Sequence, residues 1–113
     1  PMCPTELPGE RWSQLTIDVC GPFPTGEYVV VVTDYYSRWS EAKILKTVTS
    51  ANILKWLNEV FAQHGYPHVL KSDNASYFTS EEFKSTLNSW RIQLRTVTEY
   101  WHQANGQVEK FNE

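Results

Sequence analysis

The sequence predicts an α/β domain whose five-stranded mixed sheet has three antiparallel strands followed by parallel strands and is flanked by helices. Up to about residue 46, alternating or β-branched apolar segments with short connections are typical of an antiparallel meander. From about residue 50, apolar residues at 3.6-residue spacing alternate with short apolar runs, which is typical of helices that connect parallel strands. With 113 residues, of which 41% are hydrophobic, the chain fits one domain with its own core.

Three strands are expected in the first half of the chain, over residues 12–20, 27–34 and 39–46. The first alternates, with Leu15, Ile17 and Val19 on one face and polar residues on the other. The second contains four consecutive valines, which predicts a strand buried on both faces. Residues 1–11 contain prolines and a glycine without apolar periodicity, so they are interpreted as a linker or N-terminal arm.

Helices and strands alternate in the second half. A helix is predicted over residues 50–64, with a hydroxyl cap from Thr49 or Ser50 and an end at Gly65. The elements expected after it are a strand over 68–72, a helix from a capping box at 79–82 to about Trp90, a strand over 92–97 and a last helix that carries Glu109.

Three carboxylates, Asp18, Asp73 and Glu109, indicate metal-dependent chemistry. Asp18 lies in the predicted strand 12–20 and Asp73 follows the predicted strand 68–72. If these strands are parallel neighbours, both acids emerge at the sheet edge where open α/β sheets bind ligands. Thirty-five residues separate Asp73 from Glu109. Converging carboxylates are what two hard divalent cations need as ligands for phosphoryl transfer on nucleic acid.

Each carboxylate also has an ordinary structural interpretation. The alternatives are an ion pair of Asp18 with Arg11 or Arg38, an Asx-turn at Asp73, and a solvated helix position for Glu109 beside Lys110. The net charge of −3 and pI of about 5.6 argue against tight DNA binding by this chain alone.

Several other residues are expected to be structural. Trp39, Trp56 and Trp90 are expected in the core, and Cys20 is expected to be a buried small hydrophobe. Asp34 is expected to cap a turn. His64 and His68 have a zinc-like spacing, but no cysteine pair accompanies them.

Four segments, in order along the chain, resemble the catalytic core of retroviral and gypsy-type retrotransposon integrases. The segments are 12–22, which contains Asp-Val-Cys-Gly-Pro; 32–38, Val-Thr-Asp-Tyr-Tyr-Ser-Arg; 72–83, which begins Ser-Asp-Asn-Ala-Ser-Tyr-Phe; and 100–112, which contains Asn-Gly-Gln-Val-Glu-Lys. The spacing of the acids is that family's D,D-35-E pattern. The resemblance covers nearly the whole chain from Trp12 onward.

This resemblance implies a ribonuclease-H-like fold, with a catalytic core domain over residues 12–113 that is truncated in its last helix. It implies two Mg²⁺ or Mn²⁺ ions, with Asp18 bridging both, Asp73 completing one site and Glu109 the other. The implied reactions are 3′-end processing of the element's DNA and strand transfer into target DNA. Alternatives are a host-domesticated module that binds DNA or protein, and another ribonuclease-H-like nuclease or transposase.

The resemblance also implies the partners. Tyr100, Asn105 and Gly106 would lie in a loop that positions the DNA end, and Lys110 would face phosphate. DNA would be the main partner, as element ends and as target, and the protein would form a homodimer or a higher oligomer. The expected location is nuclear or intracellular, in a virus-like particle or preintegration complex; the sequence shows no signal peptide or membrane span.

The sequence departs from the family's pattern at two loop positions. Ala75 stands where the family usually has Gly, and a positive φ there would strain an alanine. His102 stands where the family usually has Pro. Neither residue is one of the expected metal ligands.

Overall fold

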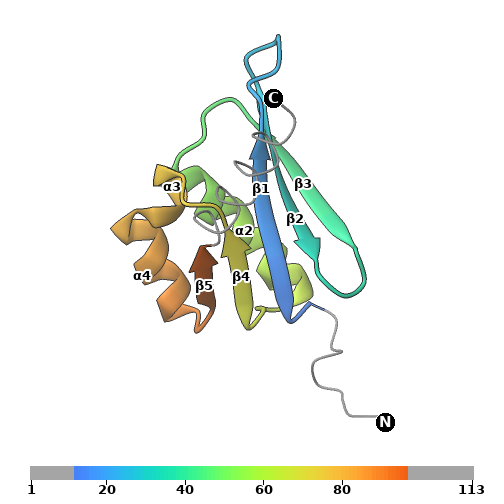
Figure 1. Cartoon of the computed structure of the whole chain (residues 1–113), viewed down its shortest axis with the longest axis vertical. Coiled ribbons are helices and arrows are strands. Elements are labelled where there is room, and N and C mark those ends of the chain that lie inside the picture. Colours follow the sequence, from blue (N-terminus) through green and yellow to red (C-terminus); the bar gives the residue numbers. More distant parts are fainter. Residues whose placement is uncertain (1–11, 97–113) are drawn as a thin grey trace, which may run out of the picture.

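The computed structural model describes residues 12–96, which form a five-stranded sheet and three helices (Figure 1). The strands are β1 (Gln14–Cys20), β2 (Tyr28–Asp34), β3 (Ser40–Leu45), β4 (Val69–Ser72) and β5 (Gln93–Thr96). The helices are α2 (Ser50–His64), α3 (Ser76–Thr79) and α4 (Glu81–Ser89). The predicted strands and the predicted helix 50–64 are confirmed, with ends that differ by at most two residues.

The strand order is β3-β2-β1-β4-β5, so β1 is central. Its pairing with β2 and the pairing of β2 with β3 are antiparallel, whereas β4 and β5 extend the sheet in parallel. The helix α2 makes the crossover from β3 to β4. The predicted mixed sheet is therefore confirmed. β4 lies parallel beside β1, which is the condition under which Asp18 and Asp73 were expected at one sheet edge.

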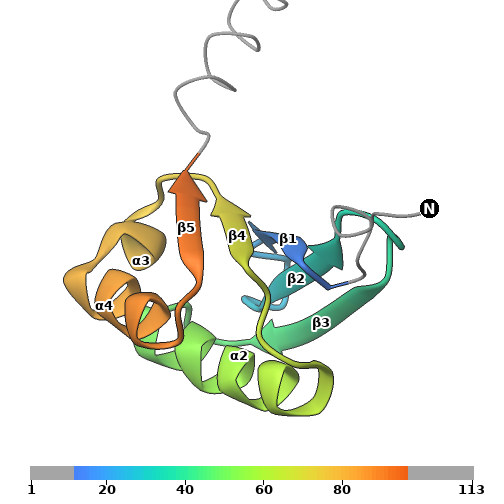
Figure 2. The same cartoon turned by 90° about the horizontal axis from the view of Figure 1, so that it is seen from below.

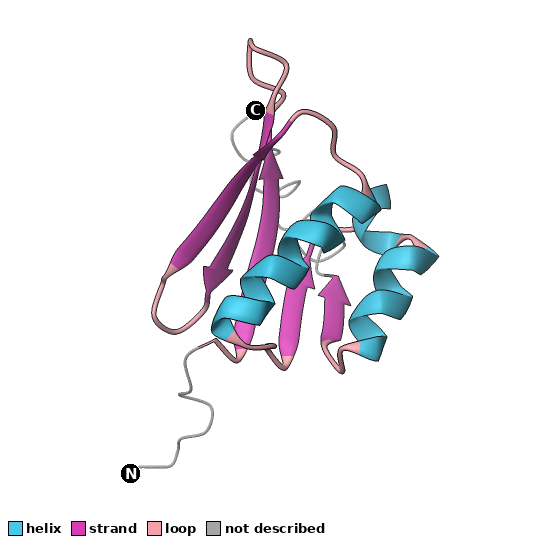
Figure 3. Cartoon of the chain, turned by 180° about the vertical axis from the view of Figure 1, so that it is seen from behind, coloured by secondary structure: helices cyan, strands magenta, loops and turns pink. Residues whose placement is uncertain are grey.

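All three helices cover the same face of the sheet, as Figures 2 and 3 show. The core fills the space between this face and α2 and α4. Its fully buried members include Leu15, Ile17, Val30, Val32, Ile53, Leu57, Leu70, Phe78, Phe83 and Leu87. Alternate residues of β1 and β2 enter this core because successive side chains of a strand point to opposite faces.

Helix α2 has the ends that its sequence predicts. The Thr49 side chain accepts a hydrogen bond from the Asn52 backbone N–H at 3.1 Å, so Thr49 is the N-cap. At the other end Gly65 adopts a φ of 98°, which favours glycine. None of the helices within residues 12–96 is long and apolar enough to cross a membrane.

The predicted capping box at residues 79–82 is wrong by one residue. The N-cap of α4 is Ser80, whose hydroxyl accepts the Phe83 N–H at 3.1 Å, so Glu82 does not occupy the third helical position. Thr79 instead ends α3, a short helix that the sequence did not predict.

Three burial predictions are wrong because the three described helices cover one face only. Strand β2 is fully buried only at alternate residues, and Val29 and Val31 are half-buried. Trp39, which precedes the edge strand β3, is 56% exposed, whereas Trp56 is buried and Trp90 packs against the core. Cys20 is exposed.

Candidate active site

Asp18 and Asp73 approach each other from the neighbouring strands β1 and β4, which lie side by side and point the same way in Figure 1. The paired residues run from Gln14 with Val69 to Thr16 with Lys71. Asp18 lies two residues after Thr16, and Asp73 lies two residues after Lys71. Asp18 directly follows the buried Ile17 in β1, and successive side chains of a strand point to opposite faces. The Asp18 side chain is therefore exposed on the face away from the core. Asp73 directly follows β4 and is also exposed.

The two carboxylates repel each other. Burial raises the pKa of Asp18, and the nearby negative charge of Asp73 raises that pKa further. Within residues 12–96 neither acid has a lysine or arginine partner, since the ion pair found there joins His64 and Glu41. The alternative pairing of Asp18 with Arg38 is therefore wrong.

Asp73 forms the Asx-turn that its sequence context allows. Its Oδ1 accepts the Ala75 backbone N–H at 3.0 Å, while no described residue donates a hydrogen bond to Oδ2. The turn thus orients the carboxylate and leaves one oxygen available. Ala75 has a φ of −58°, so the strain considered for an alanine at this position is absent.

Tyr77 is a neighbour of this acidic pair that the sequence analysis did not single out. Burial raises the pKa of its phenol, and the charges of Asp73 and then Tyr28 raise it further. The phenol therefore lies close enough to Asp73 to respond to its charge. Its signal in the sequence was only its position four residues after Asp73.

The other predicted site residues lie outside residues 12–96. They are Glu109, the third carboxylate, and Tyr100, Asn105, Gly106 and Lys110. The described part of the chain has no group of three or more His, Cys, Asp or Glu residues that could hold a metal ion. It provides two exposed carboxylates, Asp18 and Asp73, that carry like charges and lack a basic partner there; carboxylate oxygens are the donors that hard divalent cations prefer.

Asp34 has the turn-capping role predicted for it. Its carboxylate accepts hydrogen bonds from the Ser37 hydroxyl at 2.7 Å and from the Trp12 N–H at 3.0 Å. Burial raises the pKa of Asp34, but these bonds and those from the Tyr36 and Ser37 N–H groups outweigh it and hold the pKa below its ordinary value.

Three relatives of known sequence resemble the chain over nearly all of its length. It is 35% identical over 108 residues to the Pro-Pol polyprotein of feline foamy virus and 32% identical over 106 residues to the Gag-Pol polyprotein of feline leukemia virus, covering 93% of this chain in both. It is also 32% identical over 111 residues, 98% of this chain, to an uncharacterized protein of Caenorhabditis elegans. The chain spans only 6 to 9% of these relatives' own length.

Solved structures share the fold. The dimeric form of the HTLV-2 integrase catalytic core domain in complex with magnesium matches with a TM-score of 0.69 and 22% identity, over 75% of this chain and 60% of that chain. The trimeric form matches with a TM-score of 0.70 and 21% identity, over 88% and 68% of the two chains. The observed sheet thus has the ribonuclease-H-like architecture of integrase cores.

A family model described as the integrase core domain matches residues 7–100. This match covers most of the 113 residues and includes Asp18 and Asp73. The chain therefore belongs to the integrase core domain family.

Proposed function

We propose that the chain is the catalytic core of a retroelement integrase, which transfers phosphoryl groups on DNA during 3′-end processing and strand transfer. The observation that carries this proposal is the placement of Asp18 and Asp73 at the ends of neighbouring parallel strands, with their charges uncompensated among the described residues. Such a site is typical of a ligand-binding sheet edge. Membership of the integrase core family supports the same reaction class.

Asp18, Asp73 and Glu109 would hold two Mg²⁺ or Mn²⁺ ions. Asp18 would contribute to holding both ions, Asp73 would complete one site and Glu109 the other. When bound, the pair would activate the attacking oxygen and stabilise the leaving oxygen. Positive charge beside Asp18 would also relieve its repulsion by Asp73 and favour its ionised form.

The DNA would be held mainly by residues that follow the described part. Tyr100, Asn105 and Gly106 would position the DNA end, and Lys110 would contact phosphate. A glycine in that loop allows backbone angles that other residues avoid. The net charge of −3 means that these local contacts, and flanking parts of a longer protein, would supply the affinity for element and target DNA.

The assembly and location follow from the family by analogy. Matched integrase cores are described as dimeric and trimeric, and another match is a simian T-cell lymphotropic virus intasome in complex with PP2A regulatory subunit B56 gamma. We propose that this protein likewise forms a homodimer or higher oligomer. Its location would be nuclear or intracellular, in a virus-like particle or preintegration complex.

The test is cleavage and ligation of a branched DNA substrate with Mn²⁺, because this reaction depends least on binding of a DNA end. Glu109→Gln should abolish the reaction, and Asp18→Asn should reduce it at least as far. The control is Glu59→Gln, a change at an exposed position of α2, which should leave the reaction unaltered. Activity that survives Glu109→Gln would contradict the three-carboxylate site. Metal-independent DNA binding without any reaction would favour the domesticated module instead.

A further inference from the structure

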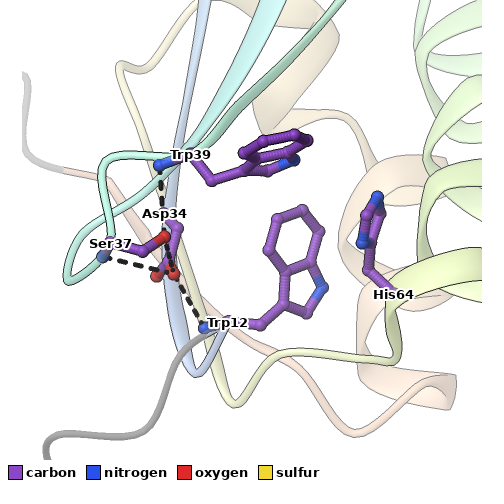
Figure 4. A pocket seen from close by; sticks show the side chains of 5 residues that line it. All are labelled: Trp12, Asp34, Ser37, Trp39 and His64. Carbon is purple, nitrogen blue, oxygen red and sulfur yellow. Dashed lines mark hydrogen bonds between the residues drawn. The ribbon is translucent and has the colours of Figure 1, made fainter.

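A pocket of about 510 Å³ lies at the end of the sheet opposite Asp18 and Asp73. Its lining residues, Trp12, Asp34, Ser37, Trp39 and His64, are called here the indole pocket (Figure 4). Trp12 precedes β1, Asp34 ends β2 and Trp39 precedes β3, whereas Asp73 follows the end of β4. The volume is in the range of small-molecule binding sites. The pocket is therefore separate from the proposed catalytic site.

Hydrogen bonds and stacking hold the aromatic rings in place. The indole Nε1 of Trp12 donates to the Gly65 carbonyl at 2.7 Å, and that of Trp39 donates to Glu41 Oε2 at 2.9 Å. The centroids of the Trp12 and His64 rings are 4.6 Å apart. Figure 4 shows the two indoles beside the same space, with the imidazole next to Trp12. Rings fixed in this way lose little further freedom when a ligand binds.

Two carboxylates lie beside these rings. Asp34 is part of the lining, and Glu41 accepts hydrogen bonds from both Trp39 and His64, the latter at 3.0 Å. The five lining residues include no lysine or arginine. An indole face attracts cations through its quadrupole, and nearby carboxylates strengthen that attraction.

The chemistry favours an organic cation over a metal ion. Within residues 12–96 no three His, Cys, Asp or Glu side chains converge as metal ligands, and the Asp34 oxygens already accept hydrogen bonds from Trp12, Tyr36 and Ser37. A methylated ammonium needs no direct oxygen ligand, because its charge is spread over methyl groups that pack on aromatic faces.

We infer that the indole pocket binds a methylated ammonium group, for which the Trp12 and Trp39 indoles form the walls and Asp34 and Glu41 supply the negative charge. Trimethyl-lysine in a protein tail and free choline-type cations share this chemistry. The inference does not depend on catalysis at Asp18 and Asp73.

The test follows the indole N–H signals of the full 113-residue chain by NMR during titration. The probes are a short peptide with one trimethyl-lysine, the same peptide with the neutral tert-butyl carbon isostere, and choline. The charged peptide should shift the Trp39 signal and bind about tenfold more tightly than its isostere. Equal binding of the two peptides, or no shift with any probe, would overturn the inference.

Two variants locate the binding. Trp39→Leu should weaken binding of the charged peptide about tenfold. Phe23→Leu, a matched loss of an exposed aromatic ring in the turn between β1 and β2, should leave it unchanged. Equal losses in both variants, or none in either, would count against the pocket. If choline binds as tightly as the peptide, the methylated ammonium group comes from a free cation. If the peptide binds clearly more tightly than choline, the group comes from a protein tail.

Discussion

Asp18 and Asp34 are two aspartates of one sheet whose surroundings move their pKa values in opposite directions. Burial and then the Asp73 charge raise the pKa of Asp18. Asp34 is almost fully buried, but hydrogen-bond donors from Ser37, Trp12 and Tyr36 lower its pKa overall. The ionised form of Asp18 is thus one that a bound cation would stabilise, whereas the ionised form of Asp34 is stabilised by hydrogen bonds within the protein.

Asp18→Asn should stabilise the metal-free fold slightly. The folded state raises the pKa of Asp18, so ionising this side chain reduces the stability of the fold. That loss of stability is absent below the pKa of about 3.9 in the unfolded chain and is fully present above the pKa in the folded protein. At neutral pH the variant should gain up to about 1 kcal/mol, since solvent screens an exposed pair. Denaturant unfolding at pH 7 and pH 3 checks this, with Glu59→Gln as the control; a marked loss of stability would mean that Asp18 is structural.

Asp34→Asn should destabilise the fold at neutral pH by about 1–3 kcal/mol, because hydrogen bonds to a buried charge are lost or weakened. The folded state lowers the pKa of Asp34, so its contribution is present above the unfolded value of about 3.9 and is lost as pH falls through the folded pKa. Acid unfolding followed by circular dichroism should therefore be shallower in the variant. An unchanged acid transition would contradict this account.

Residue burial was the least predictable property from sequence. The alternation in β1 correctly predicted which of its side chains enter the core, because period-two spacing fixes the face. The sequence did not show that the described helices would cover only one face, so Trp39 and Cys20 were wrongly expected to be buried.

At the scale of elements, the position of a helix start depends on competing hydroxyl caps. Of the two caps that the sequence allows for α2, Thr49 is the one used, and the neighbouring Ser50 hydroxyl bonds the Tyr77 carbonyl and Ser80 instead. For α4 the adjacent Thr79 and Ser80 are both plausible caps in sequence. Ser80 is the cap because Thr79 is the last residue of the short helix α3.

Thr49→Ala should reduce stability by about 1 kcal/mol, since the Asn52 N–H loses its acceptor. Thr49→Ser should restore most of that loss, because serine supplies the same hydroxyl. Thermal unfolding of the three proteins is the measurement. A serine variant as unstable as the alanine variant would show that the methyl group, and not the cap, is responsible.

At the scale of the whole molecule, much of the topology was predictable because the apolar pattern differs between the two halves of the chain. Strand patterns alone before residue 46, and helical segments that alternate with short strands after residue 50, predict a meander followed by crossovers. The structure adds that β4 lies beside β1. That placement brings Asp18 and Asp73 together as predicted. The roles of Glu109, Tyr100, Asn105, Gly106 and Lys110 stay predictions, since they lie outside residues 12–96.

The core between the sheet and helices α2 and α4 should dominate stability. Leu57 is fully buried on α2, so Leu57→Ala should cost about 2–5 kcal/mol through lost burial and a cavity. Ile44 is 60% exposed on the edge strand β3, and Ile44→Ala should cost about 0.5 kcal/mol or less. Urea unfolding of both variants checks the contrast, and similar losses would mean that β3 is covered in solution.

The central position of β1 has a kinetic consequence. Its antiparallel partner β2 is close in sequence, whereas its parallel partner β4 joins only after α2 has crossed the sheet. Closing the longer loop is entropically slower, so the meander should assemble first and the two aspartates should meet late. An ion that binds between them would then act after the folding barrier. Magnesium should lengthen the lifetime of the folded protein without shortening the time needed to reach it.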